Sequence, residues 1–216
     1  MKLVIVGGVE EKRTLLLSTL VLAGLANAVL VGGSVFLPFV PMAPLQILTN
    51  NLLYDLSQVA IPTDAVDAEQ VARPRPWAIG QIARYILFIG PCSSVSDYAT
   101  FFVMLYVFGY WDPANASLFQ TGWFVESLLT QTLIIHVIRT HRVPFVQSRA
   151  SRPLILTTVA VMVVGASLPF SPLGPVLGIV PLPALYWPLL AAILLGYVVL
   201  TQAVKSWLLA RGWVTA

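Results

Sequence analysis

The sequence predicts an all-α fold, a polytopic membrane helix bundle of six transmembrane helices with both termini cytoplasmic. Of the 216 residues, 58% are hydrophobic and 10% are charged, and the mean hydropathy is +0.86. An ordinary soluble domain has about 25% charged residues. The apolar sequence falls into six stretches, and the basic residues lie before the first, after the sixth and around alternate gaps between them. This composition excludes a soluble enzyme, a nucleic-acid-binding protein and a disordered chain.

Six stretches approach the length of about 20 mostly apolar residues that a transmembrane helix requires. They cover 14–37, 45–62, 85–111, 123–139, 153–170 and 185–204. Prolines mark the gaps, because the ring removes a backbone donor and clashes with the preceding turn. The second stretch is short and carries polar residues in its middle. We therefore expect a membrane domain over 14–216, preceded by a short cytoplasmic segment over 1–13.

All twelve basic residues lie before the first stretch, around the second or fourth gap, or after the sixth stretch. They are Lys2, Lys12, Arg13, Arg73, Arg75, Arg84, Arg139, Arg142, Arg149, Arg152, Lys205 and Arg211. The other three gaps contain no Lys or Arg. Because cytoplasmic loops of membrane proteins carry an excess of these residues, both termini and the two basic loops are predicted to be cytoplasmic.

Three acidic residues fall in the apolar stretches: Asp55, Asp97 and Glu126. A charged side chain at the bilayer centre costs about 3 kcal/mol on insertion scales, so each is a candidate functional residue. The alternative for each is a partner within the bundle or a position near the membrane interface, where the cost is small.

Asp55 shares one helix face with two amides. Asn51, Asp55 and Gln58 are spaced i, i+4 and i+7, which places them on the same side of a helix. Carboxylate and amide oxygens are the ligands that Mg²⁺ takes, so the stripe indicates a site for a hard cation. The alternative is that the amides form hydrogen bonds between helices.

The other two acidic residues have different surroundings. Asp97 lies among Ser93, Ser96 and Thr100 at helical spacing, and small hydroxyl residues of this kind favour close helix packing. Glu126 falls in the first turn of the fourth stretch, near the extracytoplasmic interface. A carboxylate costs little there and suits the positive end of a helix, so a binding role and an interfacial position both stay open.

The remaining polar and aromatic residues indicate no catalytic site. His136 and His141 flank the cytoplasmic end of the fourth stretch and are predicted to be interfacial anchors. Trp111, Trp123 and Trp187 fall at the ends of stretches, as in an aromatic belt. The single cysteine, Cys92, excludes an intramolecular disulfide and a cysteine-based zinc site.

The string FLPFVPMAPLQILTNNLLYDLSQVAIPTDAVD, residues 36–67, resembles the turn between the fifth and sixth helices of bacterial magnesium-transporting P-type ATPases. The likeness continues through IGPCSSVSDYATF (89–101), through 118–148 and LPFSPLG (168–174), and ends with PLLAAILLGYVVLTQAVK (188–205). Several of these strings are typical of the magnesium branch of the family. The chain thus resembles the C-terminal transmembrane domain of these pumps, the cation-transporting ATPase C-terminal region.

The resemblance implies that the six helices are the last six of a ten-helix pump in the bacterial inner membrane. It implies that Asn51 and Asp55 are ligands of the transported Mg²⁺, and that Glu126 occupies an acidic position that some P-type pumps use in their eighth helix. Residues 63–84 would be the cytoplasmic loop that relays movements of the phosphorylation domain. The lipid bilayer is the expected partner, and nucleic acid is not.

The chain also departs from the family. It has no DKTGT phosphorylation motif and no TGE dephosphorylation motif, so ATP would act only through domains absent from this chain, carried by another chain. Residues 9–14 resemble the end of a phosphorylation domain. The fifth-helix equivalent lacks its polar block, with Asn27 as one candidate replacement. We therefore expect a truncated pump; the alternative is a non-catalytic membrane protein, either a split-pump subunit or a non-functional remnant.

Overall fold

The computed structural model describes residues 33, 35–64, 79–140 and 142–212, and of 79–86 the backbone only. Its helices are α2 (Pro44–Gln58), α4 (Ile79–Phe102), α5 (Ala116–Ile138), α6 (Arg152–Ser167), α7 (Gly174–Leu177) and α8 (Tyr186–Ala210). Within these ranges there is no strand, only an isolated bridge between Pro144 and Ser148. The predicted all-α class is confirmed. Most of the first predicted stretch, 14–37, lies outside the described residues.

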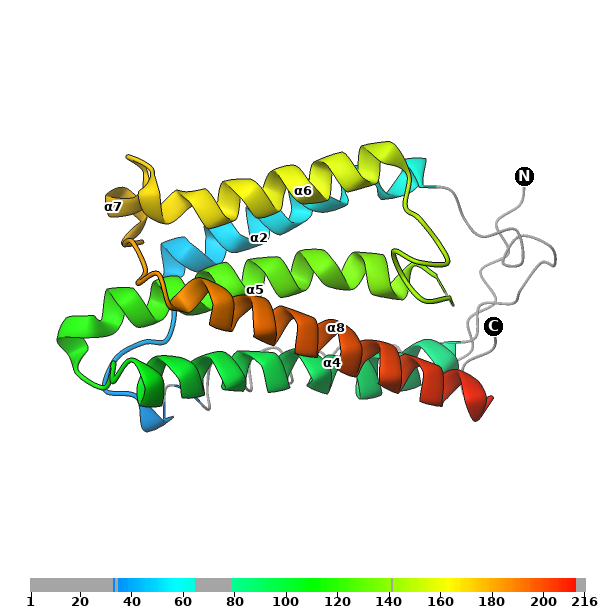
Figure 1. Ribbon diagram of the computed structural model, residues 1–216, viewed down its shortest axis with the longest axis horizontal. Helices are drawn as coiled ribbons and strands as arrows, with labels where there is room; N and C mark the ends of the chain where they lie inside the picture. The colour runs from blue at the N-terminus through cyan, green and yellow to red at the C-terminus, as the bar shows by residue number, and fades with distance from the viewer. Residues whose placement is uncertain (1–32, 34, 65–78, 141, 213–216) are drawn as a thin grey trace, which may run out of the picture.

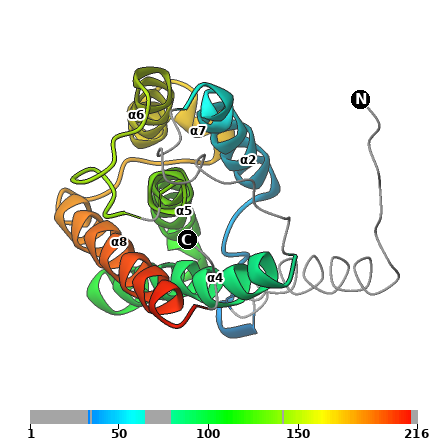
Figure 2. The ribbon, with the colours of Figure 1, turned by 90° about the vertical axis from the view of Figure 1, so that its right-hand side faces the viewer.

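Helix α5 occupies the centre of the bundle. Helices α2 and α6 lie on one side of it, and α4 and α8 lie on the other (Figure 1). The end-on view shows α5 surrounded by the other long helices (Figure 2). Over an apolar stretch of 18 residues in each segment, the share that is buried inside the bundle is 78% for α5, 33% for α6 and 17% for α8. Side chains of α5 therefore form the interior of the bundle, and functional groups on α5 are shielded from its surroundings.

The outer faces of the peripheral helices are apolar. Large hydrophobic side chains are exposed on α2, α6 and α8, among them Leu48, Leu52, Leu156, Val163, Leu195 and Val199. Soluble proteins rarely expose apolar surface so extensively, whereas a lipid bilayer requires it. The exposed faces agree with the membrane location that the composition predicts.

Three described segments are long and apolar enough to cross a membrane: Pro113–Ile138, Arg152–Phe170 and Tyr186–Ala210. The predicted count of six spans is thus supported for three. Helix α2 has 15 residues, which reach about 22 Å, less than the ~30 Å of a hydrocarbon core. Helix α4 is longer, but its serines and Asp97 lower its mean hydropathy.

Several boundaries differ from the predicted ones. Helix α5 begins at Ala116, a full two turns before the predicted start at 123. Helix α8 continues to Ala210 and thus includes Lys205, which was expected to follow it. Helix α4 contains Pro91 and passes into a π-helical segment, Val103–Val107. These shifts arise because polar residues continue a helix when tertiary contacts satisfy them.

The basic residues that the structure describes gather at one end of the bundle. This end contains the C-termini of α2, α5 and α8 and the N-termini of α4 and α6 (Figure 1). The sequence between Tyr85 and Ile138, which runs to the opposite end and back, contains no Lys or Arg. The alternation of basic and non-basic loops is therefore present in the fold. That the basic end faces the cytoplasm stays a prediction.

The turn between α6 and α8 holds α2 in place. The buried Gln46 side chain donates to the carbonyls of Leu177 at 3.2 Å and Gly178 at 3.1 Å, and it accepts from the Ala43 amide. Gly178 has a φ of +67°, which glycine adopts without strain. A Cβ on Gly174 would lie 2.9 Å from the Ile179 carbonyl oxygen and 3.0 Å from that of Leu168. The turn thus depends on two glycines.

Candidate functional site

Helix α2 presents two polar faces. Asn51 and Asp55, the predicted cation ligands, are both exposed. The polar residues that α2 turns into the bundle are Gln46, Asn50 and Ser57. The Asn50 amide donates to the Phe124 carbonyl of α5 at 3.4 Å, and among the described residues no donor reaches its Oδ1 atom. The i, i+4 spacing of Gln46 and Asn50 was visible in the sequence, but spacing alone does not show which polar face is buried.

Glu126 lies deep inside the bundle. It is the eleventh residue of α5, counted from Ala116, and its exposed fraction is 0%. Neither carboxylate oxygen receives a hydrogen bond from the described residues. The expectation that Glu126 falls in the first turn of its helix is wrong, because α5 begins earlier than the apolar stretch does. A carboxylate in such a place requires a cation or a proton.

Asp97 of α4 lies against Glu126. The two carboxyl groups are close enough to act on each other electrostatically. The indole Nε1 of Trp123 donates to Asp97 Oδ1 at 2.7 Å, and the Trp123 ring is buried against Phe101 with 4.9 Å between ring centroids. Asp97 therefore does join two helices, as the packing interpretation expected. Trp123 belongs to the interior rather than to an aromatic belt.

The structure brings together only part of the predicted set. Asn51 and Asp55 share the exposed face of α2, while Glu126 on α5 contacts Asp97 of α4. Within the described ranges, no hydrogen bond or ion pair joins Glu126 to either α2 residue, and no three His, Cys, Asp or Glu side chains are grouped closely enough to hold a metal. A magnesium site made of Asn51, Asp55 and Glu126 stays a prediction.

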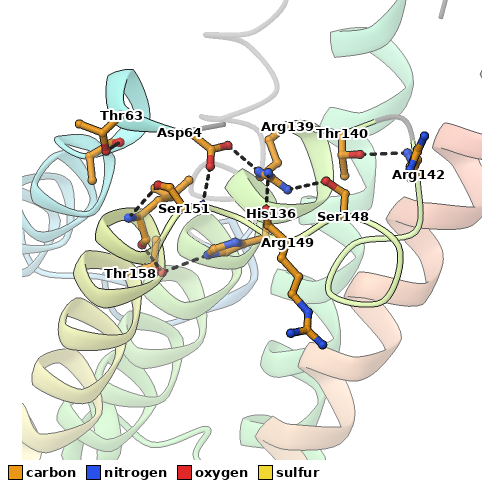
Figure 3. Close-up of polar contacts among 12 residues, drawn as sticks. Thr63, Asp64, His136, Arg139, Thr140, Arg142, Ser148, Arg149, Ser151 and Thr158 are labelled. Atoms are coloured by element: carbon orange, nitrogen blue, oxygen red, sulfur yellow. Dashed lines mark hydrogen bonds and ion pairs between the residues drawn. The ribbon is translucent and has the colours of Figure 1, made fainter. Parts of the chain in front are cut away.

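At the basic end of the bundle, a polar cluster joins three segments (Figure 3). Asp64 follows α2, and its Oδ2 atom lies 2.6 Å from Arg139 Nε at the end of α5. Its Oδ1 atom accepts from the backbone amide of Ser151, the N-cap of α6, at 2.7 Å. Arg139 also donates to Ser148 Oγ and to the Arg149 carbonyl. Sequence patterns did not predict this cluster, because its members lie far apart in the chain.

Lys205 ties α8 to the end of α5. Its ammonium group donates to the carbonyls of Val137, Thr140 and Arg142, at 2.9, 3.2 and 3.1 Å. The side chain is 1% exposed. Carbonyls at a helix C-terminus lack intrahelical donors and carry partial negative charge, so a buried ammonium group is well matched to them.

His136 is a helix-to-helix contact. Its Nε2 atom lies 3.0 Å from Thr158 Oγ1 of α6, and the side chain is buried. The sequence predicts an interfacial anchor here; in the structure His136 joins α5 to α6 near the C-terminal end of α5. His141 lies outside the described residues.

A helical bundle with an apolar outer surface and three segments long and apolar enough to cross a membrane has the features of a membrane domain. The family model for the C-terminus of cation transporting ATPases matches residues 39–207. The chain belongs to this family, as the sequence strings indicated.

Three of the relatives carry the name magnesium-transporting ATPase, P-type 1. The one from Escherichia coli K12 is 55% identical over 181 residues, and so is one from Salmonella typhimurium LT2. A further protein of the Salmonella strain is 46% identical over 178 residues. These matches cover 82–83% of this chain and 20% of each relative. The chain therefore spans about one fifth of the length of the curated relatives it matches.

Proposed function

We propose that this chain is the membrane domain that forms the cation pathway of a P-type Mg²⁺ transporter in the bacterial inner membrane. The 55% identity to a magnesium-transporting ATPase supports the ion and the class of pump. The observation that carries the proposal is Glu126, a fully buried carboxylate on the central helix whose oxygens have no described donor. Buried acidic groups inside membrane domains are typical of ion pathways.

The proposed ligands of the transported ion are Asn51, Asp55 and Glu126. Mg²⁺ retains several waters and needs only one or two carboxylates with further oxygen ligands, so the three side chains provide sufficient chemistry. Asn51 and Asp55 are one helical turn apart, so they lie on the same face of α2. A carboxylate on an exposed face of a membrane helix is costly unless a cation or a partner helix neutralises it, which supports a binding role for Asp55.

Transport requires that the site open alternately to each side of the membrane. ATP-driven phosphorylation would occur in domains outside these 216 residues and would tilt these helices as rigid bodies. The Asp64–Arg139 ion pair supports such coupling, because it links the segment that leaves α2 to the ends of α5 and α6. Movement of the loop over 63–84 would then reach α2 and α5 together.

Mg²⁺ binding to the full 216-residue chain in detergent tests the first step. We expect Mg²⁺ to raise the unfolding temperature of the wild type, and we expect Asp55→Asn to abolish that rise, since the carboxylate charge is lost while the shape is kept. Asp112→Asn is the matched control, because Asp112 is exposed and caps a short helix before α5. An equal response of Asp55→Asn and wild type would contradict the proposed site.

Transport is tested by replacing the corresponding part of the Escherichia coli relative with residues 39–207 of this chain and measuring Mg²⁺ uptake by cells that lack other uptake systems. We expect uptake by the chimera and none by its Asp55→Asn form at equal protein level. Uptake that survives Asp55→Asn would exclude an essential role for the Asp55 charge.

A further inference from the structure

Three backbone carbonyls converge on one buried point at the basic end of the bundle. Val137 lies in the last turn of α5, and Thr140 and Arg142 lie in the loop that follows it. Their oxygens are 2.9, 3.2 and 3.1 Å from the Nζ atom of Lys205, which reaches them from α8. The Lys205 side chain is 1% exposed, and among the residues that the structure describes no carboxylate forms an ion pair with it. Neutral oxygens therefore hold this cation.

The segment that carries these carbonyls has contacts of its own that do not involve Lys205. The Arg142 amide donates to Thr140 Oγ1 at 3.1 Å, and this bond holds the turn that contains two of the three carbonyls (Figure 3). The Thr140 side chain is buried. The third carbonyl, that of Val137, is fixed in direction by α5. The three oxygens are thus oriented by the backbone and by Thr140, before any cation is considered.

A set of neutral carbonyl oxygens suits a monovalent cation. Carbonyls at the C-terminus of a helix carry partial negative charge, and backbone carbonyls replace the hydration shell of K⁺ in channel filters. NH₄⁺ is close to K⁺ in size and donates hydrogen bonds to the same kind of oxygen. Mg²⁺ instead keeps several of its waters and binds through carboxylates. These three oxygens therefore differ in chemistry from the proposed magnesium ligands.

The hydrocarbon stem of Lys205 lies inside the bundle. Lys205 belongs to the buried face of α8, one turn after Thr201 and one turn before Leu208, both of which are fully buried. Truncation of Lys205 at Cβ would remove the Cγ, Cδ and Cε methylenes and the ammonium group. Because packed surroundings relax only in part, a cavity of that shape would remain, and it would end at the three carbonyl oxygens.

We propose that the carbonyls of Val137, Thr140 and Arg142 form a site for a monovalent cation of the ammonium type, and that Lys205 supplies the resident cation on a tether. A tethered group is present at its site at a high effective concentration, so free K⁺ does not displace it in the wild type. The chain thereby carries its own cation at the junction of α5 and α8. The site is separate from the proposed magnesium ligands and does not depend on the proposed transport function.

Chemical rescue of Lys205→Ala tests the site, with the full chain in detergent and choline as the background cation. Propylammonium replaces the removed Cγ, Cδ, Cε and Nζ atoms, 1-propanol has the same number of heavy atoms without the charge, and choline is a cation without N–H donors. We expect propylammonium to raise the unfolding temperature of Lys205→Ala saturably, by about 5 °C, and we expect no such rise with 1-propanol or with more choline. The yield of folded protein purified in each additive is a second readout, so a variant too unstable to melt still tests the site.

The wild type and Arg211→Ala are the controls. The wild type keeps its tethered cation, and Arg211→Ala removes an exposed cation that lies over the Trp207 ring at the C-cap of α8. Lys205→Met keeps the volume of the stem, so it should be stabilised by NH₄⁺ and not by propylammonium. Equal unfolding temperatures or yields of Lys205→Ala in propylammonium and in 1-propanol would overturn the proposal. So would a response of either control as large as that of Lys205→Ala, or a Lys205→Met variant that does not respond to NH₄⁺.

Discussion

At the residue scale, Lys205 shows how one buried charge is satisfied by backbone carbonyls, without a counter-charge from the residues that the structure describes. Its ammonium group has three donors, and three carbonyl oxygens at the end of α5 and in the following loop accept them. Hydrogen bonds that involve an ionised group are roughly twice as strong as neutral ones. The residue therefore contributes both to the orientation of α8 relative to α5 and to the satisfaction of carbonyls that would otherwise be buried without donors.

Lys205→Met is expected to lower the free energy of unfolding by about 3 kcal/mol, because it leaves three acceptors without their donor. Thermal unfolding of the full chain in detergent measures the effect. Ala203→Met places the same side chain at an exposed position of α8 and should change stability little. Equal stabilities of the two variants would contradict the role assigned to Lys205.

At the element scale, α2 is a short polar helix placed by its neighbours. Its 15 residues include a buried face with Gln46 and Asn50 and an exposed face with Asn51 and Asp55. The Gln46 side chain forms hydrogen bonds with the backbone amide at the start of α2 and with two backbone carbonyls of the turn around α7. Isolated helices of this length are marginal in water, so the position of α2 depends on such contacts.

Gln46→Leu should therefore destabilise the protein by about 2 kcal/mol, because the carbonyls of Leu177 and Gly178 lose a buried donor. Chemical denaturation followed by circular dichroism measures the change. Gln58→Leu is the matched control on the same helix, since Gln58 makes no hydrogen bond to the described residues. A larger loss in the control than in Gln46→Leu would refute this account of how α2 is held.

At the scale of the whole molecule, the bundle is closed at its basic end by the cluster around Asp64 and Arg139. These two residues are 75 positions apart, and together with Ser151 they join the exit from α2, the end of α5 and the start of α6. The ion pair is only 10–11% exposed, so it is screened less than a surface pair. A force applied at the loop after α2 would reach the central helix through this cluster.

Asp64→Ala should speed hydrogen exchange at the Ser151 amide and lower stability by about 2 kcal/mol, because the variant removes the acceptor of that amide and one partner of a largely buried pair. Hydrogen exchange followed by mass spectrometry measures the first effect, and thermal unfolding measures the second. Asp112→Ala removes an exposed carboxylate that caps a single amide, and we expect a smaller loss there. Unchanged exchange at Ser151 would show that the cluster does not restrain α6.

Much of the architecture could be predicted from local patterns. Hydrophobic composition indicated the membrane, the apolar stretches located the long helices, and the spacing of basic residues anticipated which helix ends lie together. The position of Glu126 could not be predicted in this way, because the polar residues before 123 continue α5 once their side chains are bonded within the fold. For the same reason hydropathy did not show that α8 continues past 204.

The candidate site, too, could be predicted from the sequence only in part. Asp55, Asp97 and Glu126 were identifiable as costly charges, since the cost of a carboxylate in lipid depends only on its place in an apolar stretch. Which of these residues meet depends on how each helix is rotated about its axis, because the side chains of consecutive helical residues point in directions about 100° apart. Asn50 rather than Asn51 faces α5, and Asp97 rather than Asp55 meets Glu126.

The sequence by itself determined three things: that this chain is a helical membrane domain, which segments of it lack charged residues, and which family it belongs to. Those properties depend on composition and on short strings of residues. The tertiary structure alone decided that α5 is central and that Asp97 and Glu126 share one buried contact. The physical reason is that burial is a property of packed surfaces: a carboxylate acquires its neighbours only when helices distant in the chain are brought face to face.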